Sequence, residues 1–152
     1  SSQSNKSKKK VTNLNDQILL LSSGTKIRMY YCTLLGHNNL FSKHKSNGMR
    51  IVHKSVAFLS DCEIKGLSAD GICMAGGKAV VNNCNVVGNI GAGIHGTNQG
   101  RLVLSRTRVK DNKLYGVYLE GDHFRALVAQ SVVAGNSKGQ VKHGEGVKIL
   151  NE

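Results

Sequence analysis

Three side chains suited to acid–base chemistry stand at matching places in the chain. Arg50, His95 and Tyr118 each follow a glycine and an apolar residue. Imidazole and phenol groups can accept or donate a proton, and a guanidinium can neutralise a carboxylate. We therefore take these three residues as catalytic candidates. The alternative interpretation is that they are ordinary surface residues.

Other chemical motifs are missing. The cysteines, at positions 32, 62, 73 and 84, include no C-x-x-C pair, and the chain has neither His-Glu-x-x-His nor Gly-x-Ser-x-Gly. We predict no metal and no cofactor. The cysteines are expected to be reduced and mostly buried, which favours an intracellular location. Residues 1–16 lack the apolar core of a secretory signal, although an extracellular location stays open.

The charge balance points to an anionic partner. Lys and Arg number 21 against 9 Asp and Glu, a formal net charge of +12. We expect a basic outer surface that binds a polyanion. The alternative is that these cations only solubilise the strands. The predicted anion-binding residues are a recurring set and a nearby cluster: Lys26, Lys78, Arg101 and Arg125, with Arg106, Arg108 and Lys110.

A repeat in the sequence would place the catalytic candidates and the basic residues at regular positions. Pairs of glycine and an apolar residue begin at Gly48, Gly71, Gly93 and Gly116, at steps of 23, 22 and 23 residues, and Gly146 continues the series after 30. Within each unit, apolar residues alternate with a period of two, which is typical of short strands. Three strands per unit leave no room for a helix. The pattern predicts a solenoid whose stacked turns share one core.

The repeat also assigns side chains to the inside and the outside. A column of small side chains is expected inside, and an asparagine column is expected at the turn after the third strand. The first column is Cys32, Cys62, Cys84, Thr107 and Ser131; the second is Asn89, Asn112 and Asn136. One outward line is expected to hold the catalytic candidates: Arg50, Cys73, His95, Tyr118 and Lys148. Another is apolar, and it is either a covered surface or, if the alternation slips by one residue, core: Phe58, Val80, Val103 and Leu127.

Two turns are longer than the rest. They hold Asn39 to Ser46 and Ser137 to Glu145. Insertions in repeat proteins map to loops and often mark a binding face, so these are either binding loops or plain solvated loops.

The pattern resembles the right-handed parallel β-helix of pectate-lyase-like proteins, including NosD-like proteins and the β-helix segments of F-box and SHC-binding scaffold proteins. The resemblance is carried by GICMAGGKAVVNNCNVVGN, GIHGTNQGRLVLSRTRVKDN and GVYLEGDHFRALVAQSVVAGN. It implies an all-β, single-stranded, right-handed parallel β-helix over residues 17–152, with about five turns of 22–30 residues. Residues 1–16 are expected to form a basic disordered tail.

The resemblance allows several functions. In the resembled enzymes the substrate groove follows the outer face of strand one, where His95 and Tyr118 could abstract the C5 proton of a uronate and Arg50 could neutralise its carboxylate. The calcium-binding aspartates of such lyases and the Asp-Pro-His signature of mannuronan epimerases are absent, and no paired carboxylates suggest glycoside hydrolysis. We therefore favour a non-catalytic binding or scaffold module that recognises an acidic polysaccharide, an acidic protein surface or nucleic acid.

Two alternatives to that function remain. One is a polysaccharide lyase or epimerase that acts on uronate-containing glycans, and the other is a structural subunit of a larger assembly. The open ends of the β-helix could pair with another copy of the chain or with another protein, and the Lys-rich tail could contact nucleic acid. No membrane contact is expected, because no apolar run approaches 18 residues.

Overall fold

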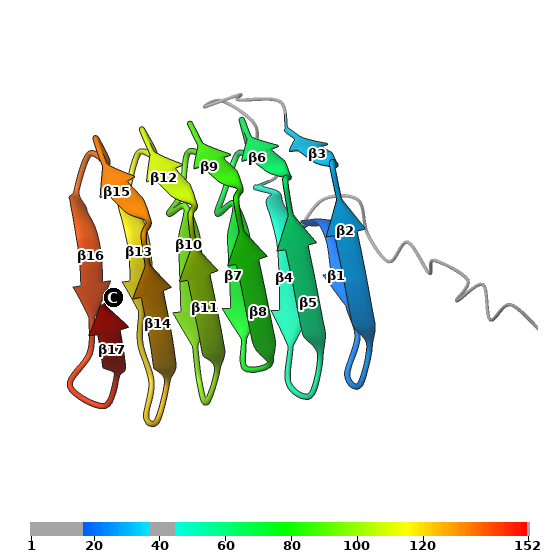
Figure 1. The fold of residues 1–152 in the computed structure, drawn as a ribbon, viewed down its shortest axis with the longest axis vertical. Coiled ribbons are helices and arrows are strands. Elements are labelled where there is room, and N and C mark those ends of the chain that lie inside the picture. Colours follow the sequence, from blue (N-terminus) through cyan, green and yellow to red (C-terminus); the bar gives the residue numbers. More distant parts are fainter. Residues whose placement is uncertain (1–16, 37–44, 152) are drawn as a thin grey trace, which may run out of the picture.

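A computed structural model describes residues 17–36 and 45–151 (Figure 1). The predicted tail at 1–16 and most of the predicted loop from Asn39 to Ser46 lie outside these residues. Across the described ranges the chain contains strands and turns and no α-helix. The all-β class is therefore confirmed.

The described strands form three parallel sheets. Sheet A contains β1 (Gln17–Leu21), β4 (Asn47–Val52), β7 (Ile72–Ala75), β10 (Ile94–Thr97), β13 (Tyr115–Leu119) and β16 (Gly139–His143). Sheet B contains β2 (Lys26–Tyr30), β5 (Val56–Ser60), β8 (Lys78–Asn82), β11 (Arg101–Ser105), β14 (Arg125–Ala129) and β17 (Lys148–Asn151). Sheet C contains β3 (Thr33–Leu35), β6 (Glu63–Lys65), β9 (Asn85–Val87), β12 (Arg108–Lys110) and β15 (Val132–Ala134).

Each strand from β1 to β14 pairs with the strand three places later in the chain, so each of the first five described turns contributes one strand to each sheet. Within the described ranges, β1 to β15 form five successive triplets, and β16 and β17 begin the next turn. Figure 1 shows the turns side by side along one axis, with each sheet forming one face of the solenoid. Each turn therefore buries its apolar side chains against the turns before and after it.

The core consists of the apolar side chains that the period-two alternation assigns to the inner face of each strand. Sheet A points Met49, Ile51, Ile72, Met74, Ile94, Val117 and Leu119 inward; sheet B points Ala57, Leu59, Ala79, Val81, Leu102, Leu104 and Ala126 inward; sheet C points Ile64, Val86 and Val109 inward. All of these side chains are buried. The apolar line through Phe58 and Val80 is not part of this core, because both residues are half-buried on the outer face of sheet B.

The column of small side chains lies at the corner between sheets B and C. Here the backbone N–H of Cys62 donates to Sγ of Cys84, that of Cys84 to Oγ1 of Thr107, and that of Thr107 to Oγ of Ser131. These side chains thus accept hydrogen bonds from the turn before them, which places them just ahead of the sheet C strands. Cys32 departs from the prediction. It is only partly buried, because it lies in the first described turn.

The asparagine column forms a hydrogen-bonded ladder at the corner between sheets C and A. Asn89 donates from Nδ2 to Oδ1 of Asn112 (2.9 Å), and Asn112 donates in the same way to Asn136 (2.9 Å). The ladder requires a glycine beside it. A Cβ on Gly93 would lie 2.5 Å from Cγ1 of Val109 and 2.8 Å from Nδ2 of Asn112. The glycine repeat therefore makes room for the ladder.

The last turn differs from the sequence prediction. Val117 pairs with Val141, so the expected partner Gly146-Val147 is out of register, and Ser137 to Glu145 contains β16 instead of an inserted loop. Lys148 pairs with Arg125 in sheet B and is not in the row of Tyr118. The prediction failed because β16 carries a single apolar residue, Val141, and the Gly-Val pair downstream imitated the repeat.

Burial of the thiols predicts unequal reactivity. Cys62 and Cys84 are buried, and burial raises the pKa of the Cys84 thiol to about 11. Cys73 and Cys32 are only partly buried. In the folded protein, iodoacetamide should therefore modify Cys73 and Cys32 before the buried pair, as measured by peptide mass spectrometry against time. Equal rates for Cys84 and Cys73 would contradict the assigned faces.

Candidate functional site

The predicted basic residues of sheet B form an outer row that a valine interrupts in the second turn. Lys26, Lys78, Arg101 and Arg125 share one register position, which Val56 occupies in the second turn and Lys148 in the last. We call these five cations the basic row. Neighbouring strands lie about 4.8 Å apart, so like charges recur at that spacing. Among the described residues, no acidic side chain forms an ion pair with any of the five.

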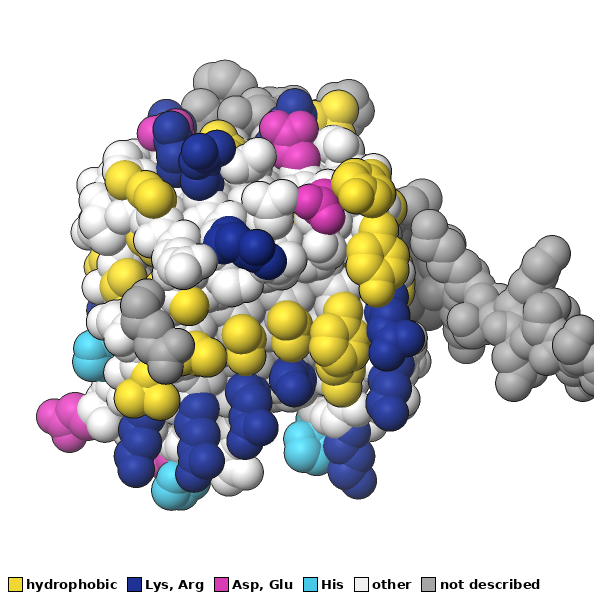
Figure 2. Space-filling view, in the orientation of Figure 1, with side chains coloured by type: hydrophobic (Ala, Val, Ile, Leu, Met, Phe, Trp, Pro, Cys, Tyr) yellow, Lys and Arg dark blue, Asp and Glu magenta, His cyan; other side chains and the backbone are white. Residues whose placement is uncertain are grey.

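A second row runs parallel to the basic row, two residues further along each strand. It consists of Arg28, Phe58, Val80, Val103, Leu127 and Leu150. The guanidinium of Arg28 lies 5.4 Å from the ring centre of Phe58. Figure 2 shows the hydrophobic row directly beside a row of Lys and Arg side chains. We call Phe58, Val80, Val103, Leu127 and Leu150 the apolar row.

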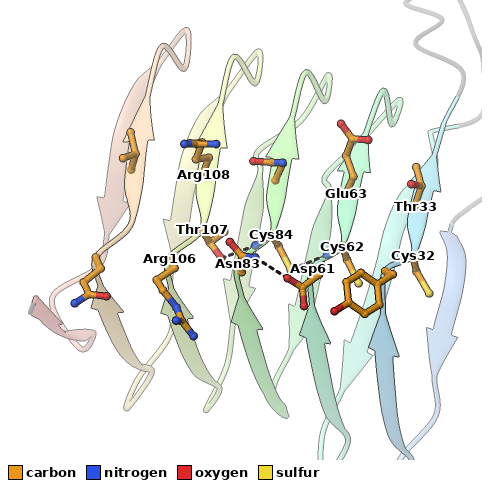
Figure 3. Close-up of a pocket in the computed structure, with 14 residues that line it drawn as sticks. Cys32, Thr33, Asp61, Cys62, Glu63, Asn83, Cys84, Arg106, Thr107 and Arg108 are labelled. Atoms are coloured by element: carbon orange, nitrogen blue, oxygen red, sulfur yellow. Dashed lines mark hydrogen bonds between the residues drawn. The ribbon is translucent and has the colours of Figure 1, made fainter.

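A third register position completes the outer face of sheet B. Ser60, Asn82 and Ser105 occupy it on the central strands, with Tyr30 on β2 and Ala129 on β14. Oγ of Ser105 donates to Oδ1 of Asn82 (2.8 Å). Beyond them the corner between sheets B and C is hollowed into a groove of about 690 Å³ (Figure 3). Five left-handed residues, one per turn, lie along it: Tyr31, Asp61, Asn83, Arg106 and Gln130.

The remaining predicted anion-binding residues lie away from the basic row. Arg106 and Arg108 line the groove, where Arg106 donates to Oδ1 of Asn82 from Nε (3.3 Å) and Nη2 (3.0 Å). Lys110 ends β12 on sheet C. Arg101 and Ser105 are the two ends of β11, so Arg106 lies at the opposite end of that strand from the basic row. The structure thus separates the seven residues into a row of four and a group of three.

The catalytic candidates lie on the outer face of sheet A. Arg50, Cys73, His95 and Tyr118 follow one another in register on β4, β7, β10 and β13, and Lys142 takes the next place. The rings of His95 and Tyr118 stack in parallel with their centres 4.9 Å apart. The structure therefore brings His95 and Tyr118 together, and it places Arg50 two strands away from His95.

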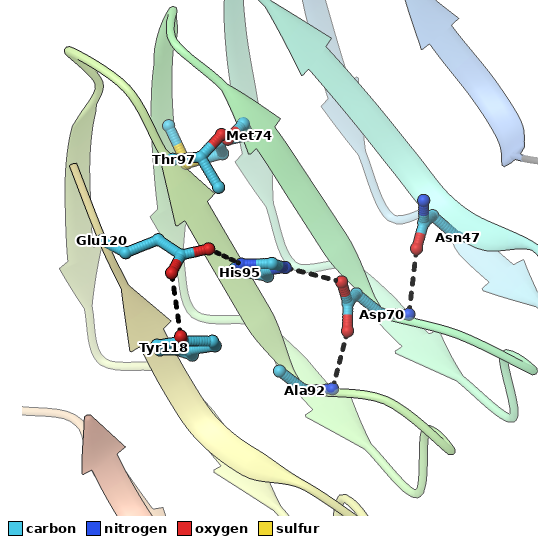
Figure 4. Close-up of polar contacts among 8 residues, drawn as sticks. All are labelled: Asn47, Asp70, Met74, Ala92, His95, Thr97, Tyr118 and Glu120. Atoms are coloured by element: carbon cyan, nitrogen blue, oxygen red, sulfur yellow. Dashed lines mark hydrogen bonds and ion pairs between the residues drawn. The ribbon is translucent and has the colours of Figure 1, made fainter. Parts of the chain in front are cut away.

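Two carboxylates hold the imidazole of His95 (Figure 4). Nδ1 lies 3.1 Å from Oδ2 of Asp70, and Nε2 lies 3.1 Å from Oε1 of Glu120. The other oxygen of Glu120 accepts from the Tyr118 hydroxyl (2.8 Å), and Oδ1 of Asp70 accepts from the backbone N–H of Ala92 (2.8 Å). Both carboxylates are thus fixed from two sides.

This arrangement shifts the ionisation of its members. The hydrogen bond to Asp70 raises the pKa of His95, with a further contribution from Glu120, although burial opposes the shift. Hydrogen bonds from Tyr118 and His95 lower the pKa of Glu120, and Glu120 raises the pKa of the Tyr118 hydroxyl. Burial, followed by the nearby charge of Asp70, raises the pKa of the Cys73 thiol.

This geometry does not favour proton abstraction by His95 or Tyr118. A base needs a free lone pair that faces the substrate, whereas both ring nitrogens of His95 lie against carboxylates and the Tyr118 hydroxyl donates a hydrogen bond to Glu120. The carboxylates of Asp70 and Glu120 would also repel a uronate carboxylate. The geometry of this cluster therefore does not favour lyase or epimerase chemistry at His95 and Tyr118.

The pKa of His95 should lie above the ordinary value of histidine, because Asp70 holds the imidazole. Asp70→Asn should lower its pKa, because the amide keeps an oxygen for the Ala92 N–H but carries no charge. Since the folded-state pKa is raised, the stabilisation from the pair is present at low pH and is lost as the pH rises through that pKa. Proton NMR of the imidazole against pH measures the shift. An unchanged pKa in Asp70→Asn would contradict the assigned pair.

Sequence reasoning did not assign Asp70 and Glu120 to the cluster. Asp70 lies in the connection before β7 and Glu120 follows β13, so each is 25 residues from His95. The repeat length could have indicated them. A turn spans 22 or 23 residues at this point of the chain, so a residue 25 positions from His95 lies on a neighbouring turn, close to the level of His95. In the described part of the chain, Asp70, Cys73 and His95 also bring three possible metal-ligand atoms within 4.8 Å of one another.

Among the described residues, no helix is long and apolar enough to span a membrane.

The comparisons with known proteins agree with this fold. No curated protein and no solved structure gave a significant match. The sequence model described as the right-handed β-helix region matches residues 16–152. The chain therefore belongs to the right-handed β-helix family.

Proposed function

We propose that the chain is a non-catalytic module that binds a linear acidic polysaccharide along the outer face of sheet B. The observation that carries the proposal is the pairing of the basic row with the apolar row on consecutive turns. Cations can neutralise carboxylate or sulfate groups, while aliphatic side chains can pack against the apolar faces of sugar rings. The side chains of Ser60, Asn82 and Ser105, at the next outward position, can form hydrogen bonds with sugar hydroxyls.

Nucleic acid fits this face less well. Single-stranded nucleic acid is bound by stacking of bases on aromatic side chains. In the apolar row, only Phe58 is aromatic, and Val80, Val103 and Leu127 line the central turns. An acidic protein surface would not need a cation that recurs from turn to turn. The repeat of one cation on most turns favours a polymer whose charges also repeat.

A binding panel tests the proposal. Heparin and alginate should bind, neutral dextran should not, and single-stranded DNA of matched charge should bind more weakly than the polysaccharides. Affinity should fall when the salt is raised from about 50 mM to about 200 mM, because counterions compete for the row. No binding to either acidic polysaccharide at low salt, or stronger binding to DNA, would overturn the proposal.

A further inference from the structure

We infer that Asp70, Cys73 and His95 form a binding site for a zinc ion on the outer face of sheet A. The inference is independent of polysaccharide binding, which uses sheet B. Cys73 and His95 are register partners on β7 and β10, and Asp70 lies in the connection that leads into β7. Their donor atoms all lie within 4.8 Å of one another.

The donor set matches the chemistry of zinc. Thiolate, imidazole and carboxylate are the three protein ligands that zinc takes, whereas calcium and magnesium prefer oxygen alone. A thiolate at Cys73 and the carboxylate of Asp70 would also balance the charge of a divalent ion. This compensation matters in a chain with a formal net charge of +12.

Two of the three ligand atoms already have the separation that a zinc site needs, and Sγ of Cys73 lies within 4.8 Å of both. Two nitrogen or oxygen ligands about 2.0–2.1 Å from a tetrahedral ion lie about 3.3 Å apart. Nδ1 of His95 and Oδ2 of Asp70 are 3.1 Å apart, which is close to that separation. The side chains are also accessible to an ion, since His95 is 24% and Asp70 17% exposed.

Glu120 would act as a positioning residue. Its Oε1 lies against Nε2 of His95, so Nε2 keeps its proton and Nδ1 is left to face the metal. Tyr118 fixes the other oxygen of Glu120. Metal-binding histidines in proteins commonly donate their second N–H to a carboxylate in this way, which fixes the ring and strengthens the ligand. The structure therefore supplies both the ligands and their support.

Binding would replace protons by the metal. The zinc ion forms bonds to Nδ1 of His95, Sγ of Cys73 and Oδ2 of Asp70, while the Nδ1 proton of the imidazolium and the thiol proton pass to solvent. Three protein ligands leave one tetrahedral position for water or an external ligand.

Titration of the full chain with Zn²⁺ and with Co²⁺ tests the site. Calorimetry should show one strong Zn²⁺ site per chain, and Co²⁺ should produce a thiolate charge-transfer band in the near ultraviolet. Cys73→Ser should abolish that band and weaken Zn²⁺ binding by at least ~100-fold. Zn²⁺ should also protect Cys73, but not Cys32, from iodoacetamide.

Matched variants keep the test decisive. Cys32→Ser and His53→Ala remove the same side-chain types elsewhere and should bind Zn²⁺ as the unchanged chain does. Glu120→Gln should fold normally and weaken binding by about 10- to 100-fold. Absence of Zn²⁺ binding at micromolar concentration, or Zn²⁺ binding that Cys73→Ser leaves unchanged, would overturn the site. Circular dichroism confirms that each variant is folded.

Discussion

Replacing Asn112 by alanine should lower the free energy of unfolding by about 3–5 kcal/mol. The reason is that its side chain links its own turn to the turns before and after it through buried hydrogen bonds. Oδ1 of Asn112 accepts from both the backbone N–H (3.1 Å) and Nδ2 (2.9 Å) of Asn89. Its Nδ2 donates to Oδ1 of Asn136 (2.9 Å) and to the carbonyl of Val86 (3.3 Å). Alanine would leave these buried groups without partners.

Chemical denaturation measures this loss, and the melting temperature should fall by roughly 10 °C. The matched control is Asn85→Ala, because Asn85 lies half-buried on the outer face of β9 and outside the ladder. The control should change stability by no more than about 0.5 kcal/mol. If Asn112→Ala and Asn85→Ala cost the same, the ladder does not stabilise the fold as the hydrogen bonds indicate.

Reversing three cations of the basic row should weaken polysaccharide binding by at least ~100-fold. In the triple variant Lys78→Glu, Arg101→Glu and Arg125→Glu, three contacts worth about 1 kcal/mol each in water are lost and replaced by repulsion. The remaining affinity should depend less steeply on salt, because fewer counterions are exchanged. Affinity for heparin at several salt concentrations measures both effects.

A second triple variant separates the row from overall charge. Arg108→Glu, Lys110→Glu and Lys113→Glu also remove six units of the +12 charge, but these residues lie on or next to sheet C. We expect this variant to lose far less affinity than the first. Equal losses would show that net charge, and not the row on sheet B, drives binding. Because the exchanged side chains of both variants lie outside the core, denaturation midpoints should stay close to that of the unchanged chain.

The sequence was sufficient to predict the solenoid and the faces of most strands. Alternation with a period of two assigns neighbours such as Leu102 and Val103 to opposite faces without knowledge of the whole fold. The 22–24-residue repeat then stacks equivalent positions, which places Lys78 next to Arg101 and Asn89 next to Asn112. These features follow from local pattern and period, and the structure confirms them.

Only the tertiary structure could supply the last turn and the His95 cluster. In β16 the single apolar residue Val141 gave too weak a local pattern, and its register is fixed by pairing with β13. Asp70 lies in a connection and Glu120 beyond a strand end, where side-chain direction does not follow the alternation of a strand. Their meeting at His95 depends on how three successive turns stack, because a connection is positioned by the strands that it joins.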